Sequence, residues 1–582
     1  MNISVPQLTT IEYVVIIVYL IFLAAVGPLM KSFTSDSSDY FNGGARTKWW
    51  LLGPSLAVSV TSAAVFTGVA GAIFEAGLAP MASNIGQYVA GIILVLFLAA
   101  WFRQLRKVTP AEVMRERFGP ATEQFFAYVG MFMQPVYGAF QLLGLAIFVA
   151  AVFQLSMTAV IIGLGVVVGF YSVSGGKWAV MATDFVQSLV LMLVMVAIGI
   201  LAVVKMGGVS SFVERVSNSG GFAMSHADGA YPDGRYTMGW LIAVFCMQFI
   251  SQLQLGWSAR FFSAKDGKEA QKATALMLVM LMVSTLCFLC VPLAAKVLYS
   301  DQVMAYASVL KKPEEAAYVV ACLNLLPAGV MGLVLVAMFS ASASSMDTGL
   351  NANAAIIVRN ILPPLRRKLH MPMLDSQSEL AVGKTVSIIL CLVIVGITLT
   401  LAHFGKAGIF EIMLSFAACV NFPMTLPFFL VLFLKRAPRN SALSSIIAGL
   451  ILPWLIQPLF LHYGFSMNFS ERLILTTSCS LLGFFGSYLF RSKESPEDRR
   501  AIEAFYAQMH RPVDFEKEVG QGSDLKQLKL LGNLSCMMGA VILLLLFVPN
   551  TWLDRITVLS IGCCILGIGL WMLWGARRGK TS

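Results

Sequence analysis

The feature that most restricts the fold of this chain is a long series of apolar segments, separated by short charged or turn-rich stretches. A helix of about 20 apolar residues spans the roughly 30 Å hydrocarbon core of a bilayer. The 582 residues are 58% hydrophobic and 12% charged, with a mean hydropathy of +0.79. Soluble domains are only about half apolar and about a quarter charged. The sequence therefore predicts an all-α polytopic membrane protein.

Hydropathy and turn clusters predict about fifteen transmembrane helices. Their approximate bounds are 10–30, 50–77, 82–102, 122–150, 155–172, 178–204, 238–260, 272–298, 325–359, 381–402, 408–434, 440–462, 471–490, 529–549 and 553–576. The stretch before the first helix, MNISVPQLTTIE, has no basic residue, so this helix is predicted to be retained and not cleaved as a signal peptide.

The basic residues are unevenly distributed among the loops. The net charge is +11, and about three quarters of the 41 Lys and Arg residues follow odd-numbered helices. This asymmetry predicts an N-out, C-in orientation in the plasma membrane, which in bacteria is the inner membrane. It also explains the net charge without nucleic acid, and no obligatory protein partner is evident. The ten cysteines lie in or beside apolar segments without metal-ligand spacing.

Two predicted helices contain polar and glycine residues at mid-span. SLAVSVTSAAVFTGVAGAIFEAG, at 55–77, combines hydroxyls with glycines, and MQFISQLQLGWSAR, at 247–260, has a similar pattern. Each alone fits a packing surface of small residues. Together they lie five helices apart and run in opposite predicted directions. Interrupted helices at matching positions of two inverted halves are typical of the midplane site of a secondary transporter.

The stretch MFSASASSMDTGLNAN, at 338–353, is polar within an apolar helix. Ser340, Ser344, Asp347, Thr348 and Asn351 share one face of a helix with 3.6 residues per turn. A carboxylate at this depth is expected to face the bundle interior and to have a partner. Because no intramembrane Lys or Arg is available, the partner is predicted to be a bound cation or a proton. Oxygen ligands suit a small alkali ion.

A second acid, Asp184, lies in GGKWAVMATDFVQSLVLM with Thr183, Gln187 and Ser188. One interpretation of Asp184 is a carboxylate paired with Lys177 near the membrane interface; the other is a second ion or proton position.

Four motifs then carry a resemblance. SDYFNGGARTKWWLLGPSLA, GGKWAVMATDFVQS, RFFSAKDGKEAQ and LVAMFSASASSMDT together resemble the sodium/solute symporter family over about the first thirteen helices. This resemblance implies a leucine-transporter-type fold, in which helices 2–6 and 7–11 form a 5+5 inverted repeat. The implied organisation is an N-terminal helix and loop (1–49), two repeats (50–237 and 238–436), helices 12 and 13 (437–490), a charged cytoplasmic loop (491–528) and a terminal helix pair (529–582).

The resemblance also implies a principal sodium site near the first broken helix. Its ligands would be three main-chain carbonyls and one hydroxyl, those of Val58, Thr61, Ala337 and Ser340. Many family members have a further hydroxyl where this chain has Ala341, so Ser344 or water is expected to substitute. Asp184 matches an acid of the family pattern, and Asp347 stands where some members have a hydroxyl. A second cation or a proton is therefore expected at Asp184, Asp347 and Thr348.

The expected solute pocket departs further from the family pattern. Candidate positions are Val65, Asn84, Gln87, Gln254, Trp257 and Asn421. The amides are suited to binding hydroxyls or a carboxylate, with Trp257 as a wall. Alternatively, such polar side chains form interhelical hydrogen bonds worth about 0.6 kcal/mol.

The expected function is sodium-coupled symport of a small organic solute, such as a sugar, an organic or sialic acid, or an amino acid, by alternating access. The alternatives are a proton-coupled transporter of the same fold and a non-transporting membrane sensor. An enzyme is disfavoured because the sequence has no nucleophile or metal constellation and only five His residues. Sodium is the one ion that this reading requires, and no cofactor is expected.

Overall fold

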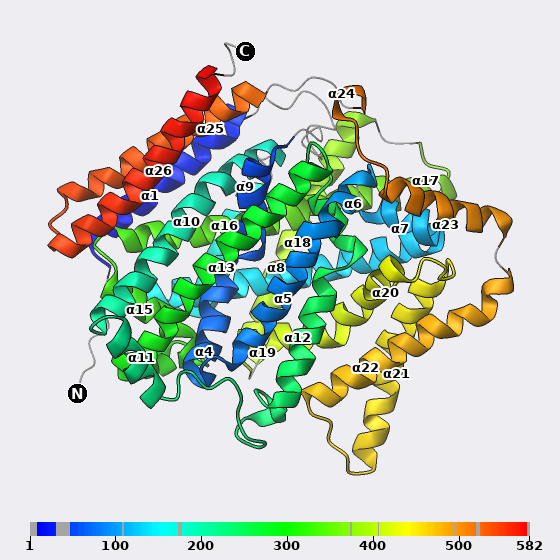
Figure 1. Cartoon of the computed structure of the whole chain (residues 1–582), viewed down its shortest axis with the longest axis horizontal. Coiled ribbons are helices and arrows are strands. Elements are labelled where there is room, and N and C mark those ends of the chain that lie inside the picture. The colour runs from blue at the N-terminus through cyan, green and yellow to red at the C-terminus, as the bar shows by residue number, and fades with distance from the viewer. Residues whose placement is uncertain are drawn as a thin grey trace.

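The computed structural model describes residues 8–30, 47–107, 110–172, 177–372, 375–404, 407–493, 495–518 and 524–578. Within helices some side chains lie outside this description, among them those of Ser344, Asp347 and Thr348. The described chain is helical, with a single β-bridge between Thr47 and Ala264 (Figure 1). It contains ten long apolar helices, one bent pair and four shorter apolar helices. These coincide with the predicted spans and confirm the all-α membrane fold, while their crossing number and direction stay predictions.

The helices follow the predicted order. After α1 (Thr10–Met30), the first set is α3 (Trp49–Val60) with η3 (Val65–Val69) and α4 (Ala70–Ala76), α5 (Ala82–Ile93) with η5 (Leu94–Leu98) and α6 (Ala99–Gln104), α8 (Pro120–Phe153), α9 (Met157–Ser172) and α10 (Lys177–Lys205). The second set is α12 (Met238–Gln252) with η7 (Leu255–Arg260), α13 (Gly267–Leu298), α16 (Val330–Ile356), α18 (Ser376–Phe404), and α19 (Ile409–Phe416) with η11 (Ala417–Asn421) and α20 (Phe422–Phe433). Next come α21 (Ser441–His462) and α22 (Phe469–Gly486).

The two sets of helices pack reciprocally. The first member of each set contacts the second member of the other set: α3 contacts α13, and α12 contacts α5. In the same way, the third member of each set contacts the fourth member of the other: α8 contacts α18, and α16 contacts α9. This exchange is what an approximate two-fold relation between repeats produces. Small residues allow it, because a Cβ atom at Gly86 of α5 would lie 2.5 Å from the Phe245 carbonyl oxygen of α12.

The two C-terminal helices form a tight hairpin that packs beside α10 (Figure 1). α25 (Asp524–Leu543) and α26 (Trp552–Arg578) meet at two glycines on each helix, seven residues apart. Gly532 faces Gly569, and Gly539 faces Gly562. A Cβ atom at Gly539 would lie 2.7 Å from the Leu566 nitrogen. Asn550, between the two helices, accepts a hydrogen bond from the Ala328 N–H at 3.2 Å, just before α16 begins.

The charged segment after α22 is docked against the membrane bundle. α23 (Pro496–Met509) packs on α6 and on α7 (Pro110–Phe118), the helix that precedes α8. Arg117 is fully buried; its Nε donates to the Tyr506 hydroxyl at 3.0 Å, and its Nη2 donates to the Ala437 carbonyl at 2.9 Å. The Tyr506 hydroxyl donates to the Val431 carbonyl at 2.6 Å. This segment therefore links α7 of the first set of helices to α20 of the second at one end of the bundle.

Candidate ion and solute site

The first helix break is sharp and is buried in protein. α3 ends at Val60, Thr61 has an extended backbone (φ −106°, ψ 112°), and the half that follows, Val65–Ala76, is bent by 58° relative to α3. The Thr61 hydroxyl donates back to the Ala57 carbonyl at 2.9 Å. Irregular backbone at membrane depth is tolerated only inside protein or along water. Such a break turns main-chain carbonyls away from the helix ladder, where they are available to a cation.

Three neighbouring helices fix this break. α8 approaches it at Gly144, where a Cβ atom would lie 2.5 Å from both Cα and N of Ala64. α19 approaches at Gly68, where a Cβ atom would lie 2.6 Å from the Ile409 side chain. α16 contributes Ser342, whose hydroxyl accepts the Ala63 N–H at 3.3 Å.

Ser342 is a contact that the sequence analysis missed, because Ser342 lies off the hydroxyl-rich face of α16. The hydrogen-bond acceptor it provides compensates an N–H group that the interrupted helix leaves free. Ser342 can be identified only from the side of α16 that faces the break, and that side is set by contacts between segments far apart in the sequence.

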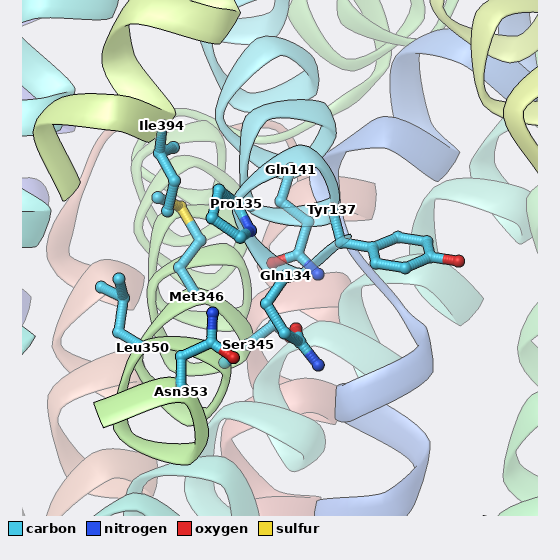
Figure 2. Close-up of a pocket in the computed structure, with 11 residues that line it drawn as sticks. Gln134, Pro135, Tyr137, Gln141, Ser345, Met346, Leu350, Asn353 and Ile394 are labelled. Carbon is cyan, nitrogen blue, oxygen red and sulfur yellow. The ribbon is translucent and has the colours of Figure 1, made fainter. Parts of the chain in front are cut away.

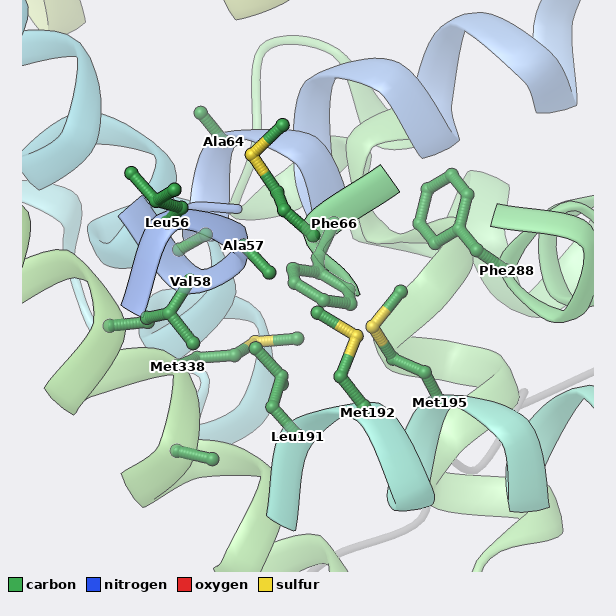
Figure 3. Packing of buried hydrophobic residues seen from close by; sticks show 14 of the residues in the cluster. Leu56, Ala57, Val58, Ala64, Phe66, Leu191, Met192, Met195, Phe288 and Met338 are labelled. Carbon is green, nitrogen blue, oxygen red and sulfur yellow. The ribbon is translucent and has the colours of Figure 1, made fainter. Parts of the chain in front are cut away.

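The predicted sodium ligands with described side chains are all buried. Val58, Thr61, Ala337 and Ser340 are each 5% exposed or less. The Ser340 hydroxyl has no hydrogen-bond partner within the described residues, although buried polar groups are normally paired. Val58 and the α16 residue Met338 belong to one packed cluster, as Figure 3 shows. The predicted contributions of Ser344, Asp347 and Thr348 lie outside the described side chains.

Asp184 of α10 lies in a second buried polar group. Its carboxylate, 3% exposed, accepts a hydrogen bond from the Ser55 hydroxyl of α3 at 2.9 Å. One turn further along α10, both amide atoms of the buried Gln187 have no hydrogen-bond partner in the described structure. Asp184 therefore links α10 to α3, the first half of the broken helix.

The predicted solute residues lie on elements that contact one another, but no direct hydrogen bond joins them in the described structure. Asn84 and Gln87 are half-buried on α5, and Asn84 accepts from the Ser83 hydroxyl at 3.2 Å. Gln254 is committed to the second helix break, because its Oε1 accepts the Gly256 N–H at 2.6 Å.

The remaining candidates occupy three different places. Trp257 lies under the guanidinium of Arg260, 4.2 Å from its ring centroid. Val65 is the first residue of η3, and Asn421 is the last residue of η11; both are half-buried. α5 packs on α12, η7 on α6 and α20, and η3 on α19, so the candidate positions border the two breaks.

The end of the bundle predicted to be outside is closed by loop contacts. Glu411 of α19 pairs with Arg235 and, at 3.6 Å, with Lys312. Glu315 accepts the Ile409 N–H at 2.6 Å, and burial raises its pKa to about 7. The Tyr231 hydroxyl donates to the Glu75 carbonyl at the end of α4, at 3.2 Å. These contacts tie α4 and α19 together above the break.

Two reciprocally packed helix sets, with breaks bordered by buried polar groups, define a secondary transporter of the leucine-transporter type. The fold is similar to that of a solved Na+-coupled sialic acid symporter in a substrate-bound outward-open state, described as revealing a novel Na+-site. The TM-score is 0.67 at 20% identity, over 84% of this chain and 99% of that one. The chain belongs to the sodium:solute symporter family, which matches residues 40–449.

Curated relatives agree with this membership. The sodium/myo-inositol cotransporter 2 of Sus scrofa is 26% identical over 479 residues, covering 76% of this chain and 69% of the relative. The sodium/sialic acid symporter NanT of Aliivibrio fischeri is 24% identical, covering 85% and 96%. The sodium/glucose cotransporter 1 of Oryctolagus cuniculus is 22% identical, covering 75% and 70%. The protein is therefore a multi-pass membrane transporter that couples sodium to the symport of a small solute.

Proposed function

We propose that sodium binds at the break between α3 and η3 and holds the two halves of the broken helix against α16. The ligands would be the carbonyls of Val58, Thr61 and Ala337 and the hydroxyl of Ser340, with Ser344 in place of the hydroxyl that Ala341 lacks. The observation that carries this assignment is the Ser340 hydroxyl, which is buried without a hydrogen-bond partner in the described structure. A bound cation satisfies such an oxygen.

The solute would bind between the two breaks, bordered by Val65, Asn84, Gln87, Gln254, Trp257 and Asn421. Sodium entering from outside would favour the state in which this region is open to the outside, and closure of the α4–α19 contacts would follow. Under the N-out orientation, a membrane potential of 100 mV adds about 2.3 kcal/mol per charge to accumulation. The proposed location is the plasma membrane, which in a bacterium is the inner membrane. Sugars, sialic acid and other organic acids, and amino acids are the candidate solutes; relatives are named for myo-inositol, sialic acid and glucose.

A second cation or a proton would bind at Asp184, with Asp347 and Thr348 of α16 completing the site. The hydrogen bond from Ser55 supports this, because it connects the acid to the same helix that carries the sodium carbonyls. The charge transferred per solute distinguishes one ion from two.

The test compares sodium responses of purified protein in detergent by thermal shift, in sodium, lithium, potassium and choline salts. Ser340→Ala is expected to raise the sodium concentration at half-effect at least tenfold. The matched control is Ser387→Ala, because Ser387 is also buried but its hydroxyl donates to its own helix at Gly383, at 3.1 Å. Equal sodium responses in the two variants would exclude Ser340 as a ligand. A wild-type protein that distinguishes no cation would refute the proposed site.

A further inference from the structure

Three segments that are far apart in the sequence meet at the start of α16. Glu12 lies in the first turn of α1, and its Oε1 accepts the Gly329 N–H, just before α16 begins, at 3.0 Å. Asn550 lies in the turn of the C-terminal hairpin, and its Oδ1 accepts the adjacent Ala328 N–H at 3.2 Å. We define the α16 clamp as the side chains of Glu12 and Asn550. Through them, α1 and the hairpin bind two consecutive amides at one helix start.

The backbone at this start is closely enclosed by both neighbours. Gly329 has φ +91°, and a Cβ atom on it would lie 2.8 Å from the Leu545 side chain of the hairpin and 3.2 Å from the Ile11 side chain of α1. A Cβ atom on Gly332, about one turn further along, would lie 2.8 Å from the Glu12 carbonyl oxygen. α1 and the hairpin therefore contact the first turn of α16 without room for another carbon atom.

The Glu12 carboxylate is held in position by its own helix. It is 5% exposed, and its Oε2 accepts hydrogen bonds from the Thr9 N–H at 2.8 Å and from the Thr9 hydroxyl. The dipole of α16 also favours a negative charge near the N-terminus of that helix. Both oxygens of Glu12 are thus engaged, one within α1 and one at α16, so Glu12 ties the position of α16 to that of α1.

Ser340, the hydroxyl proposed to bind sodium, follows the clamp on the same helix. α16 runs without a break from Val330 to Ile356, and no glycine or proline occurs between Gly332 and Ser340. These two residues are about 12 Å apart along the helix axis, at 1.5 Å per residue. A shift or rotation of the first turn of α16 is therefore transmitted to Ser340.

Few other hydrogen bonds fix the position of α16. Among its described side chains, Ser342 accepts the Ala63 N–H, and Asn353 donates to the Met131 carbonyl. Figure 2 shows Asn353 on the face of α16 beside α8, where the Ser345 hydroxyl has no hydrogen-bond partner within the described residues. The clamp therefore supplies two of the four long-range hydrogen bonds that join α16, with the two residues before it, to other described segments.

The clamp lies outside the part of the chain that the symporter family matches, 40–449, because Glu12 precedes this range and Asn550 follows it. Under the N-out orientation, the starts of α1 and α16 and the turn of the hairpin are all expected on the outer side, and their contact agrees with this arrangement. The terminal segments of this chain thus add a support to a helix of the matched region.

We propose that Glu12 and Asn550 are positioning residues for sodium: α1 and the C-terminal hairpin hold the start of α16 and so determine where Ser340 lies relative to the helix break. This inference rests on the proposed sodium site and adds the segments that hold it in place. Loss of either hydrogen bond releases the first turn of α16, so Ser340 leaves the position in which it binds the ion. Coupling of this kind is reciprocal, and bound sodium tightens the clamp in turn.

The first experiment measures the sodium concentration at half-effect for the purified full-length protein by thermal shift at constant ionic strength. Asn550→Leu removes the acceptor oxygen with little change in volume, and Glu12→Leu removes the carboxylate. Each is expected to raise the half-effect concentration at least fivefold. Glu12→Gln keeps one acceptor oxygen and is expected to lose less sodium affinity than Glu12→Leu.

Two matched controls separate positioning from general stability. Thr551→Ala changes the same hairpin turn, where the Thr551 hydroxyl donates to the Asp554 carboxylate at 2.6 Å within the first turn of α26. Glu471→Leu removes a carboxylate that accepts the Asn468 N–H in the capping box of its own helix, at 2.8 Å. Both controls are expected to keep the sodium half-effect concentration within twofold of wild type. A merely structural role of the clamp would lower the thermal midpoint in choline and leave that concentration unchanged.

The second experiment tests the reciprocal effect by hydrogen exchange at the Ala328 and Gly329 amides, the donors of the two clamp bonds. Exchange is measured by mass spectrometry of peptides that span 326–334. In the wild type, sodium in place of potassium is expected to slow this exchange at least fivefold. Ser340→Ala is expected to abolish the difference between the two salts.

The outcomes distinguish the clamp from the sodium site. Half-effect concentrations in Asn550→Leu and Glu12→Leu equal to those of their controls, or exchange that sodium does not change, would overturn the clamp and leave the sodium site in place. A wild-type protein whose thermal midpoint does not distinguish sodium from potassium would instead refute the proposed sodium site, and the clamp with it.

Discussion

Replacing Gly144 by alanine tests whether the position of the helix break controls sodium binding. A Cβ atom on Gly144 would lie 2.5 Å from both Cα and N of Ala64. Because carbon atoms pack at about 3.5–4.0 Å, α8 and the break must separate by about 1 Å. Overpacking of this kind costs about 1–3 kcal/mol. The shift acts on the segment that follows Val58 and Thr61, so we expect it to displace the proposed sodium carbonyls.

The expected result is at least a tenfold loss of sodium affinity, which corresponds to about 1.4 kcal/mol. The assay is the thermal midpoint of purified protein titrated with sodium chloride at constant ionic strength, with potassium as the balancing salt. Gly130→Ala on the same helix is the control, because a Cβ atom there has no atom within 4 Å. It is expected to keep the sodium response and to gain up to about 1 kcal/mol of helix propensity. A wild-type sodium response in Gly144→Ala would show that the break does not hold the ion.

Three further results are expected. Burial raises the folded-state pKa of Glu315 from 4.5 to about 7, so its contribution to stability is present below about pH 4.5 and is lost as the pH rises through 7. Glu315→Gln should therefore raise the free energy of unfolding more at pH 8 than at pH 5, by at most about 3 kcal/mol, which is measured as a larger rise in thermal midpoint at pH 8. An equal effect at both pH values would contradict this. Gly539→Ala should destabilise the C-terminal hairpin by about 1–3 kcal/mol in limited proteolysis, whereas Gly567→Ala, with no atom within 4 Å of its Cβ position, should not. Tyr506→Phe should accelerate hydrogen exchange in α23 by an amount equivalent to about 1.5–3 kcal/mol, since the buried Arg117 loses an acceptor; unchanged exchange would show that this bond does not hold the segment.

The helices and their two breaks were predictable because their signals are local. An apolar run of about 20 residues specifies a span whatever surrounds it. Hydroxyls and glycines at mid-span, around Thr61 and Gly256, weaken the helix where they occur. α3 does end at Val60, and α12 does end at Gln252. The charged segment 491–528 contains α23, and the docking of this helix onto Arg117 carries no local signal.

The candidate site was predictable only as far as it follows helix periodicity or family motifs. The hydroxyl-rich face of α16 can be read from spacing alone. Ser342 lies outside that face, yet its hydroxyl accepts a hydrogen bond from Ala63 at the break. The solute role expected for Gln254 stays a prediction, whereas the capping of the second break by its side-chain oxygen carries no signal in the spacing. Glu411, near the start of α19, is paired with Arg235 and Lys312, which are distant in the sequence and carry no local signal for this contact.

By itself, the sequence determined that this chain is a bundle of membrane helices with two interrupted spans and a polar face on α16, because each property depends on residues within a few turns of one another. Only the tertiary structure decided which side of each helix meets which neighbour. The rotation of α16 that puts Ser342 at the break also puts Ser345, Gly349 and Asn353 opposite α8. That rotation results from packing among residues hundreds of positions apart, such as Ala63 with Ser342, and no periodicity in one segment encodes it.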